Sequence, residues 1–309
     1  MASFMMQTIR ETTQAMTNDG LPSFGADIDP VKLRAAVETA QAAMPLQEGV
    51  TYEKLTLGGM EAELSMPTLA REDAIILYLH GGGLVCGDAS TSRGYAGMLA
   101  GESRIPVYSF SYRLAPENPY PAAVDDCVNA YHDAMEKHPD VPIFLIGESG
   151  GALLCVATAL RLRDEGTRMP AALVAYSPVL DFSDTIDRSG RGYDEITVTP
   201  EGIRALARCY CPDESCRTEP YASPYFADYT GMCPMYVVWD KGETLAADAE
   251  ALVEKARAAR VPVACKRYEG CFHAFAPVGR NTPESSELLD QSIAFMLWHL
   301  HDQKLDVEE

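Results

Sequence analysis

Apolar and polar positions change their spacing near residue 74, and this change divides the chain into two parts. Beyond that point, short apolar runs of strand length alternate with longer segments of helical periodicity. Strands that alternate with helices form a mostly parallel sheet covered by helices on both faces, an α/β fold. The predicted strands are 74–79, 106–111, 143–146, 171–176, 235–239 and 263–268, and the predicted helices are 90–103, 122–135, 152–163, 200–210, 245–260 and 286–301.

The first part of the chain, residues 1–48, follows a different pattern. It is rich in polar residues and interrupted by glycines and prolines, and helical spacing is confined to 30–43. Asp29 is a suitable N-cap for this helix, and Pro30 takes the first helical position, where a missing N–H costs no hydrogen bond. We expect 1–48 to lie outside the sheet, where it could cover a site.

A hairpin precedes the alternating region, and an insertion interrupts it. Segments 51–57 and 61–66 alternate in strand fashion around Gly58-Gly59, which predicts two antiparallel edge strands joined by a tight turn. Between 181 and 232 the alternation stops, and only one helix is evident. We expect this insertion to lie over the C-terminal edge of the sheet, within a single domain over 49–309.

Charge and composition narrow the classes of function. The chain has 309 residues, 47% of them apolar, and a formal net charge of −20, as expected for a soluble globular protein with a large core. The negative charge disfavours nucleic acids and anionic membrane surfaces as partners. No apolar run approaches the roughly 20 residues of a membrane span, and Met1–Arg10 lacks the basic-then-apolar order of a signal peptide.

The nine cysteines are an odd number in a chain without an export signal, so we expect reduced thiols and a cytoplasmic protein. Cys209, Cys211 and Cys216 are close in sequence, but no second pair or histidine cluster accompanies them at the spacing of a metal site. Cys271 is better explained as a small packed residue than as a nucleophile. We expect the protein to need no metal or organic cofactor.

The strongest chemical signal is the run Gly147-Glu148-Ser149-Gly150-Gly151, between the strand 143–146 and the helix 152–163. A strand, a G-x-S-x-G turn and a helix together form a nucleophile elbow. Its tight turn holds the serine in a strained backbone conformation, with the hydroxyl projecting at the edge of the sheet. The pattern therefore makes Ser149 a candidate nucleophile for acyl transfer.

A second glycine-rich run, His80-Gly81-Gly82-Gly83, directly follows the strand 74–79. Consecutive glycines leave backbone N–H groups unshielded, and such donors can stabilise the oxyanion of a tetrahedral intermediate. A glycine triplet alone is weak evidence, but followed by a G-x-S-x-G turn it becomes strong. We expect the N–H groups of Gly82, Gly83 and Gly150 to form an oxyanion hole.

A serine nucleophile needs a base and an acid that orients the base. Of the six histidines, His273 follows the last predicted strand and comes after Ser149, in the chain order that this arrangement requires. His80 belongs to the glycine run and is interpreted as a structural support of that loop, while the other four lie on or beside helices. Three acidic residues after the strand 235–239 could orient the base: Asp240, Glu243 and Asp248.

Further motifs strengthen this interpretation. They are Tyr112-Arg113-Leu114-Ala115-Pro116-Glu117, Pro121-Ala122-Ala123-Val124-Asp125-Asp126, Ser177-Pro178 and Tyr221-Ala222-Ser223-Pro224. Together with the glycine run, the elbow and the His273 loop, they closely resemble the bacterial hormone-sensitive-lipase-like (family IV) carboxylesterases of the α/β-hydrolase superfamily. The resemblance covers most of the chain from about residue 50. It implies an α/β-hydrolase fold, an N-terminal helical cap over 1–48 to which 181–232 contributes, short acyl-chain esters as substrates, and a plausible homodimer.

The resemblance also bears on individual residues. The family's acid lies in an acidic-x-Leu step after the penultimate strand, here Glu243-Thr244-Leu245, which favours Glu243 over the two aspartates. Glu148 and Gly150 depart from the usual Gly-Asp-Ser-Ala-Gly elbow, and Leu84 stands where an aromatic residue often follows the glycines. Candidates for a substrate pocket are Leu84, Tyr176, Phe182 and Phe24.

Four charged residues near the second motif are given structural roles. Arg113 and Glu117 are expected to form a polar brace, and Asp125 and Asp126 the solvated start of a helix. The function predicted for the chain is a serine carboxylesterase that works through an acyl-enzyme. Two alternatives stay open: an amidase or peptidase with the same triad, and a non-catalytic ligand-binding protein on a hydrolase scaffold.

Overall fold

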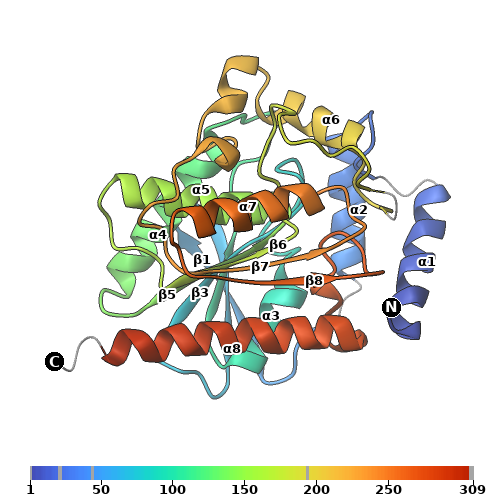
Figure 1. Ribbon diagram of the computed structural model, residues 1–309. Coiled ribbons are helices and arrows are strands. Elements are labelled where there is room, and N and C mark those ends of the chain that lie inside the picture. Colours follow the sequence, from blue (N-terminus) through green and yellow to red (C-terminus); the bar gives the residue numbers. More distant parts are fainter. Residues whose placement is uncertain (1, 20–22, 43–44, 193–194, 306–309) are drawn as a thin grey trace.

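The structure, a computed structural model, describes residues 2–19, 23–42, 45–192 and 195–305. Within these ranges eight strands form one sheet (Figure 1). The strands are β1 (Val50–Leu57), β2 (Met60–Pro67), β3 (Ile75–Leu79), β4 (Val107–Phe110), β5 (Ile143–Glu148), β6 (Ala172–Tyr176), β7 (Met235–Asp240) and β8 (Val263–Tyr268). Their order across the sheet is β1-β2-β4-β3-β5-β6-β7-β8.

In sheet order, neighbouring strands from β4 to β8 pair in parallel, whereas both pairings of β2 are antiparallel. β1 and β2 form the predicted antiparallel hairpin, in which Leu57 pairs with Met60 across the Gly58-Gly59 turn. β2 then pairs antiparallel with β4. The prediction that both are edge strands is therefore wrong for β2, because it lies between β1 and the parallel part of the sheet.

Helices cover both faces of the sheet, as the alternation predicts. The longer helices are α1 (Phe4–Asn18), α2 (Pro30–Ala42), α3 (Arg93–Ser103), α4 (Ala122–Lys137), α5 (Gly150–Asp164), α6 (Pro200–Tyr210), α7 (Ala246–Ala258) and α8 (Pro283–Leu305). Helices α4, α5 and α7 pack on one face, while α3 and α8 pack on the other (Figure 1). No helix of the described part is both long and apolar enough to span a bilayer.

The central strands are mostly apolar because both of their faces are buried. In β3, Ile76 and Tyr78 point to the core under α3 and α8, whereas Leu77 and Leu79 point to the core under α4 and α5. Alternate residues of one strand thus serve two cores. This is why the sequence shows continuous apolar runs here, in place of the polar–apolar alternation of the hairpin.

Helix α1 was not predicted from the sequence. Ser3 caps its first turn by accepting a hydrogen bond from the N–H of Met6 at 3.2 Å. Met6 is the one fully buried side chain among the described residues of this helix, and the hydroxyl of Ser3 also donates to Glu284 of α8 at 2.8 Å. The helix is held by a few contacts near its beginning, and its apolar side chains Phe4, Met5 and Met16 are exposed.

The remaining N-terminal residues and the insertion meet beyond the sheet. The N–H of Phe24 donates to the carbonyl of Thr197 at 3.0 Å, and the N–H of Thr199 donates back to Phe24 at 3.1 Å. Helix α6 begins directly afterwards and has the predicted bounds. The N–H groups of Val31 and Lys32 donate to the Asp29 carboxylate, which confirms the predicted N-cap of α2. In the described part of the insertion, the other helices are the short 3₁₀ helices η1 (Glu214–Thr218) and η2 (Pro224–Phe226).

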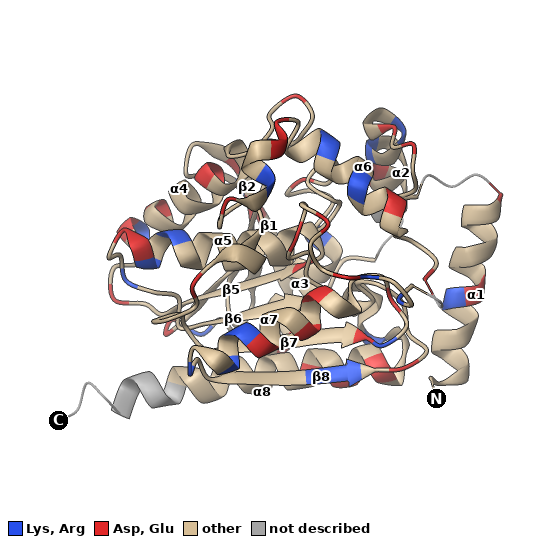
Figure 2. Cartoon of the chain, turned by 45° about the horizontal axis from the view of Figure 1, so that its top comes forward, with Lys and Arg blue, Asp and Glu red and all other residues tan. Residues whose placement is uncertain are grey.

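Charged side chains are spread over the helices and loops, with acidic ones in excess. Figure 2 shows red and blue positions interspersed along the same helices and not segregated by sign. The sequence has 45 acidic and 25 basic residues, so the surface is acidic overall.

Candidate active site

The predicted functional residues meet where the parallel strands end. Glu148 ends β5, Tyr176 ends β6, Asp240 ends β7 and Tyr268 ends β8. Because the carboxyl ends of parallel strands lie at the same edge of a sheet, the loops that follow them converge. Ser149, Glu243 and His273 are carried by three of these loops.

Ser149 sits on a strained turn, as the elbow pattern predicts. Its backbone has φ 54° and ψ −120°, a conformation that non-glycine residues rarely adopt. A Cβ at position 151 would lie 2.0 Å from the carbonyl oxygen of Leu79, so only glycine lets α5 begin this close to the end of β3. The N–H of Ser149 donates to the carbonyl of Tyr176 at 2.9 Å, which fixes the turn to β6.

A chain of hydrogen bonds joins the three side chains. Nε2 of His273 lies 2.9 Å from Oγ of Ser149, and Nδ1 lies 3.0 Å from Oε2 of Glu243. All three side chains are buried. If Nδ1 carries the proton and donates it to Glu243, Nε2 is left as the acceptor for the serine hydroxyl. This is the geometry required of a nucleophile, a base and an orienting acid.

The electrostatic surroundings favour a positive charge on His273. Burial of the imidazole disfavours that charge, but the hydrogen bond and the negative charge of Glu243 outweigh it, and the pKa of His273 is raised. Burial raises the pKa of Glu243, and its contact with the imidazole opposes this rise. The pair therefore stabilises an imidazolium at a buried position.

The two aspartates that competed with Glu243 have other partners. Asp240 accepts hydrogen bonds from the N–H groups of Gly242 and Cys271, each at 2.8 Å, and so joins the loop of Glu243 to the loop of His273. Asp248 forms a buried ion pair with Arg188 at 2.7 Å. Of the three candidates, only Glu243 makes a hydrogen bond to His273.

The glycine run lies against the elbow. A Cβ at Gly150 would be 3.2 Å from the backbone nitrogen of Leu84, so the two segments are in contact. Gly82 has φ 104°, and its carbonyl accepts hydrogen bonds from the N–H groups of Val85 and Cys86, both at 3.1 Å. The loop thus turns back beside Ser149, where its N–H groups can face an oxyanion.

Glu148 joins these two segments, a role that was not predicted from the sequence. Its carboxylate accepts hydrogen bonds from the N–H of Gly81 at 2.6 Å and from the hydroxyl of Tyr78 at 2.7 Å. Burial raises the pKa of Glu148 to about 7, although both of these hydrogen bonds lower it. His80 supports the same loop, because its ring stacks on Tyr112 with centroids 4.2 Å apart. Burial lowers the pKa of His80 to about 4.

A cavity of about 380 Å³ opens beside Ser149. It is lined by candidate catalytic residues together with residues of α3, the N-terminal segment and the insertion. The lining residues are Phe24, Val37, Tyr78, His80, Gly81, Gly82, Cys86, Gly87, Thr91, Ser92, Tyr95, Glu148, Ser149, Thr197, Val198, His273, Ala274 and Pro277.

Of the four pocket candidates from the sequence, Phe24 lines this cavity and the other three do not. The hydroxyl of Tyr176 donates to Ser292 at 2.8 Å, inside the core under α8. Phe182 packs on Tyr210 with ring centroids 5.3 Å apart. Leu84 is fully buried and contacts the elbow from behind the glycine run. These three predictions are corrected to core residues.

Several charged residues also differ from expectation. Asp126 is buried and forms an ion pair with Arg113 at 2.7 Å, so it is not part of a solvated helix start. Glu117 pairs instead with Arg34 of α2 at 2.7 Å. The guanidinium of Arg34 also donates to the carbonyl of Val85 at 2.8 Å, which ties α2 to the end of the glycine loop. The expected brace thus consists of two separate ion pairs.

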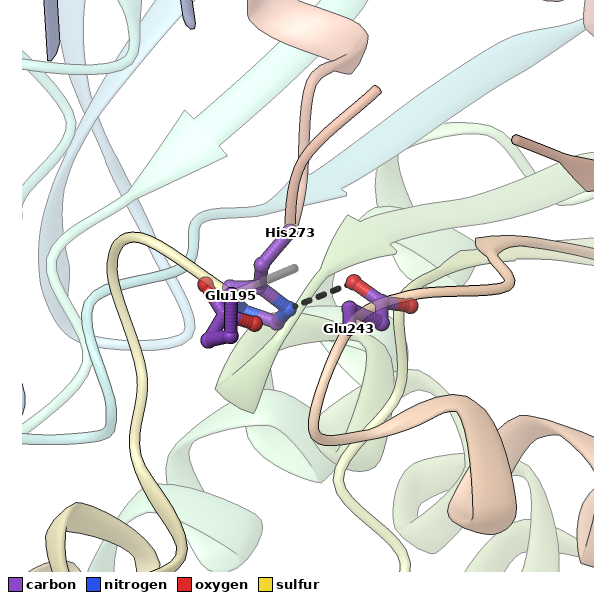
Figure 3. Close-up of side chains that lie close together, drawn as sticks. All are labelled: Glu195, Glu243 and His273. Carbon is purple, nitrogen blue, oxygen red and sulfur yellow. Dashed lines mark hydrogen bonds and ion pairs between the residues drawn. The ribbon is translucent and has the colours of Figure 1, made fainter. Parts of the chain in front are cut away.

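Glu195, in the insertion, is a further residue that the sequence analysis missed. Its carboxylate lies beside Glu243 and His273, and ligand atoms of the three residues are within 4.8 Å of one another (Figure 3). Such a group has the composition of a metal site, but both ring nitrogens of His273 are already engaged, by Glu243 and Ser149. Glu195 stands in an irregular segment with no motif around it, so no sequence signal pointed to it.

Comparison with known proteins fits this geometry. The model of the family described as having the alpha/beta hydrolase fold matches residues 76–277, which is more than half of the chain. The chain belongs to the α/β-hydrolase fold family.

Individual relatives place this α/β hydrolase more closely. It is 34% identical to the "Acetyl-hydrolase" of Streptomyces hygroscopicus over 85% of this chain and 88% of that protein. It is 29% identical to an "Esterase" of Acinetobacter venetianus over 85% of this chain and 87% of that protein. The crystal structure of an esterase from the bacterial hormone-sensitive lipase family superposes with a TM-score of 0.89, at 30% identity, over 97% of this chain and 99% of the other. The family predicted from the sequence motifs is confirmed.

Proposed function

We propose that this α/β hydrolase is a serine carboxylesterase that cleaves esters of short acyl chains through an acyl-enzyme intermediate. The observation that carries the proposal is the continuous hydrogen-bonded chain from Glu243 through His273 to Ser149, which ends at a cavity. A hydroxyl so arranged can lose its proton to the imidazole as it attacks a carbonyl carbon.

The first half of the reaction forms the acyl-enzyme. Oγ of Ser149 bonds to the ester carbonyl carbon while Nε2 of His273 takes the hydroxyl proton, which gives a tetrahedral intermediate with a negatively charged oxygen. We assign that oxygen to the backbone N–H groups of Gly82, Gly83 and Gly150. The carbon–oxygen bond to the alcohol then breaks, and His273 gives its proton to the departing alcohol oxygen.

The second half releases the acid. A water molecule takes the place of the alcohol and attacks the acyl carbon while His273 accepts one of its protons. When the second tetrahedral intermediate collapses, the bond to Oγ breaks and the proton returns from His273 to Ser149. Glu243 stabilises the imidazolium in both halves through its hydrogen bond to Nδ1.

The size of the cavity supports small substrates. About 380 Å³ beside Ser149 leaves room for a short acyl chain and a modest alcohol. Phe24, Val37 and Val198 supply apolar surface, in line with an acyl group in contact with this wall. The name of the Streptomyces relative, an acetyl-hydrolase, points to the same substrate class. We propose that 1–48 and 181–232 act together as the cap that closes this cavity.

The compartment is part of the same proposal. All nine cysteines carry free thiols. Cys265 is exposed and Cys86 lines the cavity, while the other seven cysteines are buried or half-buried. Unpaired thiols are typical of proteins kept in a reducing environment, and we propose that this esterase works in the cytoplasm.

Replacement of the nucleophile tests the proposal. Ser149→Ala should lower kcat/KM for p-nitrophenyl acetate and butyrate by about 10⁴-fold or more, with an unchanged circular dichroism spectrum. Ser215→Ala, a serine exposed on the insertion, is the matched control and should retain normal rates. A fluorophosphonate probe should add once to the wild type, at Ser149, and not to Ser149→Ala.

Three results would count against the proposal. Hydrolysis by Ser149→Ala at a near-normal rate would exclude this serine as the nucleophile. Failure of the wild type to react with the probe would favour a non-catalytic binding protein. Faster cleavage of p-nitroanilides than of the matching esters would favour an amidase.

A further inference from the structure

Three acidic side chains surround the imidazole of His273, and only one of them makes a hydrogen bond to it. Glu243 binds Nδ1 from the loop after β7, and Glu148, at the end of β5, lines the same cavity as His273. Glu195 approaches from the insertion, with one carboxylate oxygen within 4.8 Å of both Glu243 and His273. Figure 3 shows the Glu195 carboxylate beside the imidazole and opposite Glu243. Negative charge therefore reaches the base from two structural units, the sheet and the insertion.

The orientation of Glu195 is fixed by its own backbone surroundings. Its Oε1 accepts hydrogen bonds from the N–H groups of Ile196, Thr197 and Val198, at 2.8, 2.7 and 3.2 Å. The hydroxyl of Thr197 donates to the same oxygen at 2.8 Å. A carboxylate that accepts this many hydrogen bonds cannot rotate away without losing them.

The other oxygen of Glu195 connects the insertion to the loop of the acid. Oε2 accepts a hydrogen bond from the N–H of Thr244 at 3.3 Å, and Thr244 directly follows Glu243. A second contact lies alongside, because the hydroxyl of Thr244 donates to the carbonyl of Val198 at 2.7 Å. The segment 195–198 is thus attached to the residue next to the triad acid at two points.

The same segment forms part of the cavity wall. Thr197 and Val198 line the cavity, and the N–H of Phe24, a third lining residue, donates to the carbonyl of Thr197. Glu195 consequently stands between the wall that contacts substrate and the pair Glu243–His273 that moves the proton.

We propose that Glu195 is a positioning residue of the active site: its carboxylate stabilises the imidazolium form of His273 and fastens the cavity wall to the loop of Glu243. The proposal rests on the proposed function for its catalytic meaning. In that reaction the imidazole becomes positively charged as each tetrahedral intermediate forms, so a second negative charge nearby lowers the free energy of both intermediates. Glu195 touches neither the ester nor the serine, and acts through His273 and the wall.

The charge can be separated from the anchoring by comparing two substitutions. Glu195→Gln keeps an oxygen that can accept the three backbone hydrogen bonds but removes the charge. Glu195→Ala removes both. Glu201→Gln is the matched control, because Glu201 lies on α6 in the same insertion and its side chain is 58% exposed beside Arg204.

The pH dependence of kcat/KM gives the first readout. His273 must be neutral to act as a base, and the negative charge of Glu195 helps to raise its pKa. In Glu195→Gln the acid limb of the profile should move to lower pH by about 0.5 to 1 unit, and the plateau should fall by about 3- to 10-fold. Glu195→Ala should show the same shift together with a higher KM, since Thr197 and Val198 lose their anchor. Glu201→Gln should leave the limb in place.

Titration of the imidazole itself gives a readout that needs neither activity nor an identified ester. The Ser149→Ala protein and the Ser149→Ala/Glu195→Gln protein are compared by NMR of labelled histidine, with folding checked in the same spectra. A lower midpoint for His273 in the double variant supports the proposal even if no ester is hydrolysed. Equal midpoints, or an acid limb that does not move in Glu195→Gln, would overturn it. If Glu195→Gln proves too unstable, Glu195→Asp takes its place. A Glu195→Asp protein with the thermal unfolding midpoint and the acid limb of the wild type supports the role. A Glu195→Asp protein with the normal midpoint but a shifted acid limb refutes it.

Discussion

The carboxylate of Glu148 accepts a hydrogen bond from the N–H of Gly81 at 2.6 Å, and this contact joins the nucleophile turn to the glycine loop. Glu148 directly precedes Ser149, and Gly81 directly precedes the first candidate oxyanion donor. A movement of either segment is therefore transmitted to the other through one buried side chain. The hydrogen bond from Tyr78 holds the second oxygen of the carboxylate and completes the support.

The buried Glu148 carboxyl should make stability depend on pH. Its pKa is raised from 4.5 to about 7 in the folded protein, so the folded state holds the proton more tightly than the unfolded state. The resulting stabilisation is complete below pH 4.5 and is lost as the pH rises through 7, a change of at most about 3 kcal/mol. Because glutamine does not ionise, Glu148→Gln should gain stability relative to the wild type between pH 5 and pH 8.

Urea unfolding at these two pH values measures the effect. The control is Glu287→Gln, at a half-exposed carboxylate that pairs with Lys266. If the free energies of unfolding of Glu148→Gln and the wild type differed by the same amount at both pH values, the folded-state pKa of Glu148 would not be raised.

Substitution of Glu243 should lower catalytic activity, whereas substitution of Asp248 should lower stability. Glu243→Gln leaves the buried shape intact but weakens the stabilisation of the imidazolium, and kcat should fall by about 10³- to 10⁴-fold with little change in the unfolding midpoint. Asp248→Asn removes the buried charge that pairs with Arg188 at 2.7 Å and leaves only the longer ion pair with Asp184 at 3.6 Å. This should cost about 3–5 kcal/mol of stability, while the folded fraction keeps near-normal kcat. Steady-state kinetics and thermal melts of both variants measure these effects. If Asp248→Asn lost kcat and Glu243→Gln lost stability, Asp248 would be assigned as the acid.

Gly82 should tolerate no side chain. Its φ is 104°, and a Cβ there would lie 2.3 Å from the carbonyl oxygen of Cys86, so Gly82→Ala must displace the loop. Loss of an aligned oxyanion donor should lower kcat by about 10²- to 10³-fold while KM changes little. Gly59→Ala is the control, because it has a similar positive φ with no atom close to the added Cβ. Equal losses of activity in the two variants would mean that backbone strain, and not the oxyanion site, is responsible.

Phe24 should limit the size of the acyl group, since its side chain lines the cavity beside Ser149. Phe24→Ala should raise kcat/KM for p-nitrophenyl octanoate relative to the acetate by about 10-fold, because the added space accepts a longer chain and buries more of its apolar surface. Phe182→Leu, in the core away from the cavity, should change stability and leave this ratio unaltered. An unchanged ratio in Phe24→Ala would show that the acyl chain lies elsewhere.

The sequence predicted most of the sheet, and it made Ser149 and His273 the candidate nucleophile and base, because both predictions depend on local pattern. An apolar run followed by G-x-S-x-G has few structural solutions, and Ser149 and His273 follow strands whose ends must converge. Glu243 was harder to single out, since Asp240 and Asp248 also follow this strand, and only the family resemblance favoured it. In the structure, the direction of the side chains separates the three, because only that of Glu243 reaches His273.

The residues that the sequence analysis placed wrongly depend on contacts between distant segments. Tyr176 ends a strand that is buried on both faces, so its composition cannot show which core it enters. In the sequence, Asp126 resembles a solvated residue at the start of a helix. In the structure it forms an ion pair with Arg113 from the preceding loop. Glu195 lies in irregular backbone, where no periodicity relates a residue to its neighbours in space.

The pairing of Phe24 with the segment 197–199 has a consequence for how such an enzyme can diversify. Both segments lie outside the sheet. Insertions, deletions or substitutions in them can therefore change the size of the cavity without disturbing the strands that support Ser149. New substrate ranges can then arise by variation at two short stretches of chain. The exception is the position of Glu195, where a change made for selectivity would also remove the proposed support of the His273 imidazole.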